Sequence, residues 1–174
     1  IVVSAGRHNS IYGADGALGL NVNVEQLAHV MMKGSFQMQI PQTVKITVKG
    51  SLQGKASAMD AFITFLGDTV MENFSGRALE FTGEGMDSMT KPQRETFLSM
   101  VAQTGAVTAF YQKDAQGHCA KEMEFDLGAV VPVAALPSTL YTYKPTYDYK
   151  PISELTGIKL NQGYIGGYTG GRIE

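Results

Sequence analysis

Thr43-Val44-Lys45-Ile46-Thr47-Val48-Lys49-Gly50 alternates apolar and polar residues with a period of two. Successive side chains of a β-strand point to opposite faces of a sheet, so this alternation predicts a strand with one buried and one solvated face. The lysines on the polar side are more typical of a solvated sheet face than of a basic binding stripe. This segment is the clearest strand of the sequence.

Helices and strands alternate on the carboxyl side of this strand. Ser57 and Asp60 have the spacing of a capping box, and apolar residues follow at i, i+3, i+4 and i+7, which predicts a helix. Residues 77–82 and 106–110 are expected to form strands, and Thr90 with a proline in the next turn predicts a helix between them. This alternation indicates an α/β domain.

The amino-terminal side adds a short strand at 1–3, a turn-rich loop that carries His8, and a helix. Loops that follow strands often carry function, but a histidine incidental to a surface loop is an equally open interpretation. Asn23 is expected to cap the helix, and its apolar stripe, which includes Leu27 and Met31, is expected to serve packing rather than ligand binding.

Three regions follow from these patterns. We expect an α/β core at 1–110 and a proline-rich extended connection at 111–151, within which an apolar alternation at 123–127 predicts a strand. Residues 152–174 are expected to begin the next subdomain and to contain a glycine-rich loop. Both ends look cut, so a piece of a longer polypeptide is expected.

Composition limits the functional classes. The chain has 174 residues, of which 44% are hydrophobic, and a formal net charge of −2. These values give no electrostatic argument for nucleic acid or an anionic membrane as a partner. Cys119 is the only cysteine, which excludes an intramolecular disulfide and fits a reducing cytoplasm. No apolar run reaches the roughly 18 residues of a membrane span. We therefore expect a cytoplasmic protein.

The glycine-rich loop is Tyr164-Ile165-Gly166-Gly167-Tyr168-Thr169-Gly170-Gly171-Arg172. Glycines let a backbone turn tightly and approach a ligand closely, as around phosphates or cofactors, while a flexible end is the alternative. The sequence contains no P-loop, dinucleotide-binding, nucleophile-elbow or paired Cys–His motif. The residues alone therefore give one loop histidine and one glycine loop without an assembled catalytic set.

Several motifs in fixed order carry a family resemblance. Residues 3–16 read V-S-A-G-R-H-N-S-I-Y-G-A-D-G, in the register of a G-(A)-D-S-H-T loop followed by Y-G-A-x-G. Residues 44–52 match V-x-V-x-x-x-G-x-L, and 57–60 match S-x-K-D. Residues 94–106 match R-x-T-x-x-N-M-x-x-E-x-G-A in part, and 165–172 match I-G-S-C-T-N-G-R in part. Together they resemble the aconitase and 3-isopropylmalate isomerase (dehydratase) large-subunit family of hydro-lyases.

The resemblance implies a layered aconitase-like α/β domain, with a mixed sheet flanked by helices and parts of neighbouring domains. It implies that His8 is catalytic and that a small hydroxy carboxylic acid is the ligand. The implied substrate-binding positions are Arg7, Arg94, Ser99, Gln103 and Arg172. The implied partners are the remainder of the large subunit and a small swivelling domain or subunit, with no nucleic acid and no membrane.

The departures from the family pattern fall on the chemistry. The family holds a 4Fe–4S cluster through three thiolates, one of them in the glycine loop, and Tyr168 stands at that position. A phenol substitutes poorly for a soft thiolate. Gly6 stands where the family has a loop aspartate, and Gln103 replaces a glutamate that could accept a proton. We therefore expect a degenerate member or fragment that lacks the iron–sulfur cysteine, with no cofactor and no metal in this chain.

Three functional interpretations stay open, and whether the chain is an enzyme stays open with them. The first, which the changed positions favour, is a cluster-less, non-catalytic homologue or fragment of a hydro-lyase large subunit. The second is a hydro-lyase or isomerase of a hydroxy di- or tricarboxylic acid when full-length, with His8 as proton carrier and Arg7, Arg94 and Arg172 as carboxylate clamps. The third is a purely structural domain.

Overall fold

The structure is a computed structural model that describes residues 1–114, 117–137 and 148–167. Its centre is a four-stranded sheet in the order β5-β4-β3-β6, with every neighbouring pair parallel. The strands are β3 (Gln42–Lys49), β4 (Arg77–Thr82), β5 (Thr108–Tyr111) and β6 (Lys121–Asp126). The α/β fold is confirmed. The central sheet is parallel where a mixed one was expected, because helical crossovers join β3 to β4 and β4 to β5.

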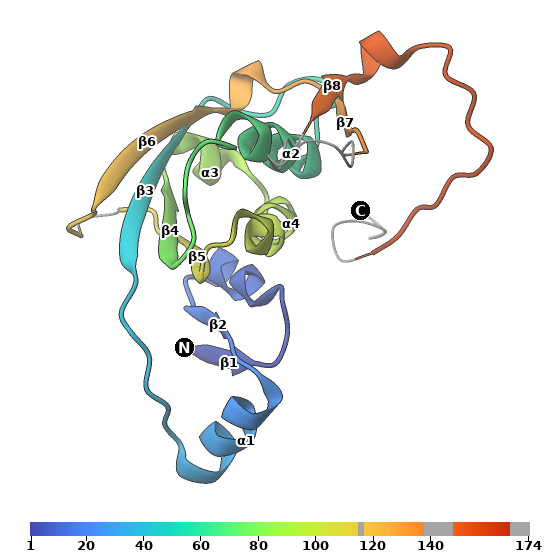
Figure 1. Ribbon diagram of the computed structural model, residues 1–174. Helices are drawn as coiled ribbons and strands as arrows, with labels where there is room; N and C mark the ends of the chain where they lie inside the picture. The colour runs from blue at the N-terminus through green and yellow to red at the C-terminus, as the bar shows by residue number, and fades with distance from the viewer. Residues whose placement is uncertain (115–116, 138–147, 168–174) are drawn as a thin grey trace.

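Helices cover one face of this sheet, as Figure 1 shows. They are α2 (Ala58–Asp68), α3 (Glu84–Ser88) and α4 (Lys91–Ser99), the last continuing as the 3-10 segment η2 (Met100–Thr104). The capping box expected at Ser57 forms, and Thr90, expected to begin a helix, forms one as well; the two side chains accept from the amides of Asp60 and Gln93. Phenylalanines of α2 and α4 meet the apolar side of β3 and β4, and this layer is the hydrophobic core.

The opposite face of the sheet is charged near β3 and β6. Lys45 pairs with Glu122 at 3.2 Å and Lys49 with Glu124 at 2.7 Å, which ties the two strands together across the solvated side. Exposed pairs of this kind contribute about 0–1 kcal/mol each. Glu80 lies on the same face and is only 5% exposed. Its burial raises the pKa of its carboxyl, an effect that the nearby Lys45 ammonium opposes.

The amino-terminal part adds a small parallel pair, β1 (Val2–Ser4) and β2 (Gly19–Asn21). The loop between them contains the 3-10 segment η1 (Asn9–Asp15), which packs against β5 and α4. This segment approaches β5 closely, because a Cβ at Gly13 would lie 2.2 Å from the carbonyl oxygen of Ala109. The histidine loop is therefore built onto the central domain rather than hanging from its surface.

Helix α1 (Val24–Lys33) forms as expected, with an Asn23 capping box and Gly34 ending it in the left-handed conformation. The expectation that its apolar stripe packs into the core is wrong. None of its ten residues is buried, and Met31 is 80% exposed. Helical periodicity predicted the element correctly but gave no information on whether this chain supplies a partner for it.

Beyond residue 110 the chain returns to the central sheet before it leaves. The strand expected at 123–127 forms β6 and pairs with β3, so the predicted connection at 111–151 contains part of the sheet. An antiparallel pair then follows, β7 (Val133–Ala135) with β8 (Tyr149–Pro151), flanked by the 3-10 segments η3 (Leu127–Ala129) and η4 (Ile152–Leu155). The domain limits at 110 and 151 stay predictions. Among the described residues no helix is long and apolar enough to cross a membrane.

Candidate functional site

The histidine loop is held by a buried asparagine. Asn9 is 6% exposed, and its Nδ2 donates to the backbone oxygens of Ser4 at 3.1 Å and Leu20 at 2.8 Å. Its Oδ1 accepts from the Ser4 hydroxyl at 2.6 Å. One side chain thus ties the loop to both strands of the β1–β2 pair. Buried polar groups satisfied in this way fix a single backbone conformation.

Two further bonds fasten the same loop to the end of α4. His8 Nδ1 lies 2.9 Å from the carbonyl oxygen of Ser99, and the Ser10 hydroxyl donates to the carbonyl oxygen of Leu98 at 2.6 Å. The last carbonyls of an α-helix lack intrahelical partners, and here α4 gives way to a 3-10 segment directly after Ser99. A helix end on the central domain therefore positions the histidine.

The bond to Ser99 assigns the tautomer of neutral His8. A carbonyl oxygen only accepts, so Nδ1 carries the hydrogen and the lone pair lies on Nε2. We expect nitrogen-15 correlation spectra of the neutral ring to show a protonated, pyrrole-like Nδ1 and a pyridine-like Nε2. The opposite pattern would contradict the bond. His29 lies on exposed α1 and serves as an internal reference in the same spectrum.

Arg94 of α4 is engaged within the chain. One of its terminal nitrogens, Nη1, donates to the carbonyl oxygens of Met86 and Met89, and its guanidinium carbon lies 5.1 Å from the centre of the Tyr111 ring. The Tyr111 hydroxyl donates to Asp87. Desolvation and this acidic partner raise the pKa of Tyr111, so the ring stays neutral beside the arginine. Arg94 Nε is buried and has no partner among the described residues.

The other predicted residues differ in burial and in the bonds that they make. Ser99 is 0% exposed and its hydroxyl donates to the carbonyl oxygen of Thr96 at 2.7 Å. Gln103 and Arg7 are exposed, the first on η2 and the second in the histidine loop. Tyr168 and Arg172 lie outside the described residues. The structure thus brings together His8 and the backbone of Ser99, but through a carbonyl rather than the side chain that the sequence singled out.

Sequence reasoning missed the residues that hold the loop. Asn9 and Ser10 are short polar side chains in a polar loop, a pattern that is ordinary on a surface. Only their burial distinguishes them, at 6% and 4% exposure. A salt bridge between Lys91 and Asp15, 2.9 Å long, also joins α4 to η1, but both partners are more than half exposed. In the sequence, Asn9 and Ser10 are distinguished only by their position directly after His8.

A separate pocket opens at the amino-terminal end of α2. It has a volume of about 800 Å³ and is mainly apolar, with Val131, Pro132 and Ile152 on one side and the amino-terminal turn of α2 on the other. It contains none of the predicted site residues. Asp60 is already used at its edge, accepting from Ser57 and from the amide of Val133 at 2.8 Å. Lys55 and Ser153 also line the pocket; its carboxylate is already bonded, and Lys55 is its other charged residue.

Comparison with known proteins identifies the family of this chain. Residues 1–119 match the family model of the aconitase family (aconitate hydratase). The chain belongs to the aconitase family. Along its whole length it is 29% identical to the 3-isopropylmalate dehydratase large subunit of Hydrogenobaculum sp. (strain Y04AAS1), covering 45% of that protein.

Other relatives give the same proportions. The chain is 27% identical to the 3-isopropylmalate dehydratase large subunit of Aquifex aeolicus, covering 44% of it. It is 26% identical to a probable methanogen homoaconitase large subunit of Methanosarcina mazei, covering 48% of it. This aconitase-family chain thus spans less than half the length of the curated relatives it matches.

The aconitase family uses a 4Fe–4S cluster, and the residues of this chain do not fit one. Such clusters are held by several cysteine thiolates, and Cys119 is the only cysteine. Its Sγ lies 3.5 Å from Glu122 Oε1, and desolvation together with this carboxylate raises the pKa of the thiol, which opposes thiolate formation. No group of three or more His, Cys, Asp or Glu among the described residues could hold a metal ion.

Proposed function

We propose that this chain is a cluster-less, non-catalytic part of an aconitase-family hydro-lyase large subunit. It contributes a folded α/β unit to an assembly whose other members are the remainder of a large subunit and a small swivelling domain or subunit. Any small hydroxy carboxylic acid binds only in that assembly. The similarity to large subunits over the entire chain, at less than half their length, supports the view of a part rather than a whole.

The proposal rests on two side chains of α4 that bond to the chain's own backbone. Arg94 directs Nη1 at two backbone carbonyls and stacks against Tyr111, whereas a carboxylate clamp needs its guanidinium donors directed at the ligand. Ser99 is fully buried with its hydroxyl bonded to Thr96. Two of the positions that the family resemblance assigns to substrate therefore stabilise the chain's own structure.

Iron analysis tests the absence of a cluster. After anaerobic reconstitution with iron and sulfide, the chain is expected to retain far less than one cluster per molecule, because a 4Fe–4S cluster needs several thiolates and the chain has one cysteine. Electron paramagnetic resonance of the reduced sample should show no cluster signal. The Hydrogenobaculum large subunit, reconstituted in parallel, controls for the procedure. Stoichiometric iron and sulfide in the chain would refute the proposal.

The alternative function is a hydro-lyase or isomerase of a hydroxy di- or tricarboxylic acid in the full-length protein. The fixed tautomer of His8 favours it, since a lone pair on Nε2 is what a general base requires. Titration calorimetry with citrate and malate separates the two proposals. Binding by the wild-type chain that is lost in His8→Ala supports the alternative. Turnover by the full-length protein that is unchanged in His8→Ala counts against it.

A further inference from the structure

A long excursion of the chain has no buried residue. Between Asn21 and Thr43 every residue is either exposed or half-buried, although this stretch contains the complete helix α1. Figure 1 shows α1 at the end of the molecule opposite α2, separated from the central sheet by β1 and β2. Leu27, Val30 and Phe36 are half-buried, but no side chain of the segment is fully buried, so burial offsets less of the conformational entropy lost than it does in the core.

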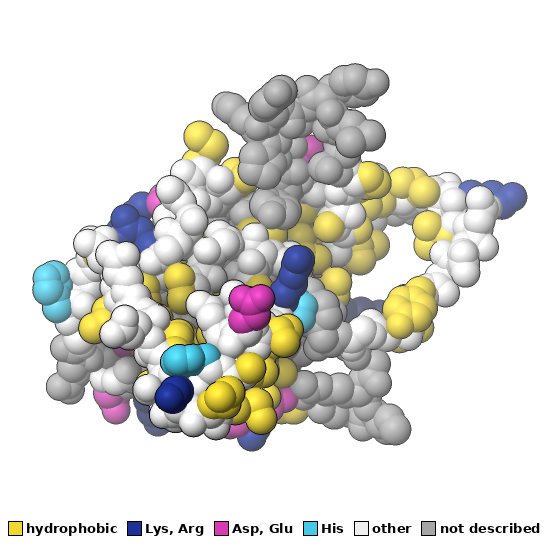
Figure 2. Space-filling view, turned by 60° about the horizontal axis from the view of Figure 1, so that its bottom comes forward, with side chains coloured by type: hydrophobic (Ala, Val, Ile, Leu, Met, Phe, Trp, Pro, Cys, Tyr) yellow, Lys and Arg dark blue, Asp and Glu magenta, His cyan; other side chains and the backbone are white. Residues whose placement is uncertain are grey.

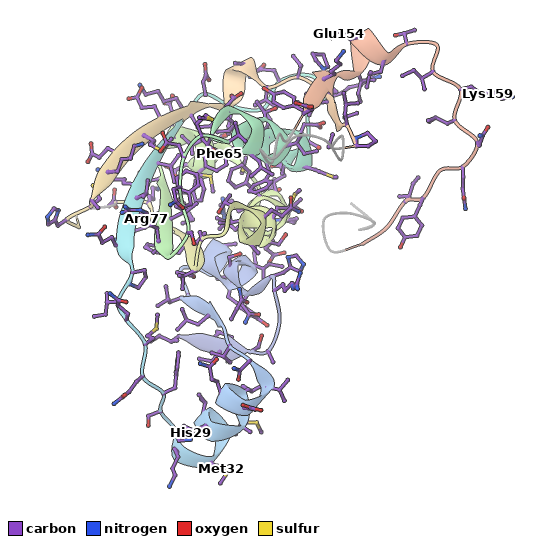
Figure 3. The ribbon with its side chains drawn as sticks, viewed as in Figure 1. His29, Met32, Phe65, Arg77, Glu154 and Lys159 are labelled. Atoms are coloured by element: carbon purple, nitrogen blue, oxygen red, sulfur yellow. The ribbon has the colours of Figure 1, made fainter. Side chains whose placement is uncertain are left out.

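The exposed side of α1 is apolar. Val24, Ala28, Met31 and Met32 stand at i, i+4, i+7 and i+8 and form one stripe, called here the α1 face. Val24 is 74% exposed, and Met31 and Met32 are each 80% exposed. Gln26, His29 and Lys33 lie on the other side of the helix, and Glu25 borders the stripe beside Met32. Figure 2 shows hydrophobic side chains gathered at this end of the molecule, and Met32 lies at its tip in Figure 3.

Local signals alone do not account for this helix. It has a full capping box and a left-handed Gly34 at its end, but only ten residues. Isolated helices shorter than about 12–15 residues are marginal in water, and most helical stability in proteins comes from packing of the apolar face. The α1 face therefore has the character of a surface that is covered in the working protein.

The relatives indicate what covers it. They match this chain from end to end and contain more than twice its length, so most of each large subunit consists of residues with no counterpart here. We propose that the α1 face docks onto the part of an aconitase-family large subunit that lies outside the matched region. This inference rests on the proposed function, because it takes the chain as part of such a subunit.

The size of the α1 face favours this occupant over a second copy of the chain. A stable interface between separate proteins typically involves about 20–30 residues on each side. The α1 face has four residues, extended by Ile40, which is 88% exposed on the segment after the helix. A patch of this size suits contacts between parts of one subunit, which need not offset the entropy of association.

The test compares the chain alone with a chimaera in which it replaces the matched segment of the Hydrogenobaculum large subunit. Hydrogen–deuterium exchange is measured on the amides of α1, and we expect exchange about tenfold slower in the chimaera because docking suppresses local unfolding. Met32→Glu should abolish the added protection. His29→Glu places the same charge on the polar side of the same helix and should leave the protection intact.

Two results would overturn the proposal. One is equal exchange of α1 in the chain alone and in the chimaera. If the chimaera does not fold, the chain is joined by a flexible linker to the unmatched segments of the same relative, so that the contact stays within one polypeptide, and absence of protection there counts equally. The other is a dimer of the isolated chain in sedimentation that Met32→Glu dissociates, because the occupant is then a second copy. Iron bound by the chain alone would refute the proposed function and leave the exchange result unaffected.

Discussion

Phe65→Ala is expected to lower the free energy of unfolding by about 3–5 kcal/mol. Phe65 is 1% exposed and stands among five other phenylalanine rings, with centroid distances from 5.4 Å to Phe125 to 6.2 Å to Phe74. Figure 3 shows Phe65 between the central sheet and α2, in the upper part of the view. It joins α2 to strands on both sides of β3, so its loss leaves a cavity that no single neighbour can fill.

The measurement is urea denaturation followed by circular dichroism. A domain of this size has a total stability of about 5–15 kcal/mol, so the variant should unfold at a much lower urea concentration or lose its cooperative transition. Met59→Ala is the matched control, because Met59 lies on the same helix and is 42% exposed. It should change the stability by about 0.5 kcal/mol or less. Equal effects of the two substitutions would show that Phe65 is not central to the core.

Much of this core could be predicted from the sequence because its signals are local. The alternation at 43–50 predicted β3, the capping box at Ser57 predicted the start of α2, and Thr90 with the proline after it predicted the start of α4. Each of these depends on residues within one turn or one strand. The short helix α3 was missed, because Gly83 and Gly85 around its start are more typical of a turn.

The arrangement of the site could not be predicted in the same way. The bond from His8 to Ser99 joins residues 91 positions apart, and its acceptor is a backbone oxygen that no side-chain motif records. Arg94 was correctly placed on a helix, but its use of backbone carbonyls depends on how α3 turns into α4. The family pattern names positions, while their chemistry depends on contacts that arise only in the folded chain.

Gly19→Ala is expected to destabilise the chain by about 1–3 kcal/mol and to displace the histidine loop. A Cβ at Gly19 would lie 1.9 Å from the backbone oxygen of Asn9 and 2.6 Å from its carbonyl carbon. Backbone atoms cannot rotate away as the end of a side chain can, so either β2 or the loop must move. Asn9 directly follows His8, and its movement strains the bonds that His8 and Ser10 make to the end of α4.

Two readouts separate loss of stability from displacement of the loop. Urea denaturation gives the first, and the nitrogen-15 spectrum of His8 gives the second, since a broken bond to Ser99 removes the preference for hydrogen on Nδ1. Gly163→Ala is the control, because a Cβ there meets no atom within 4 Å and its backbone is not in the left-handed region. An unchanged His8 spectrum in Gly19→Ala would mean that the close approach of β2 does not position the histidine. If the variant stays folded and its His8 spectrum changes, Gly19 fixes the conformation of the histidine loop, which the family resemblance assigns to the active site.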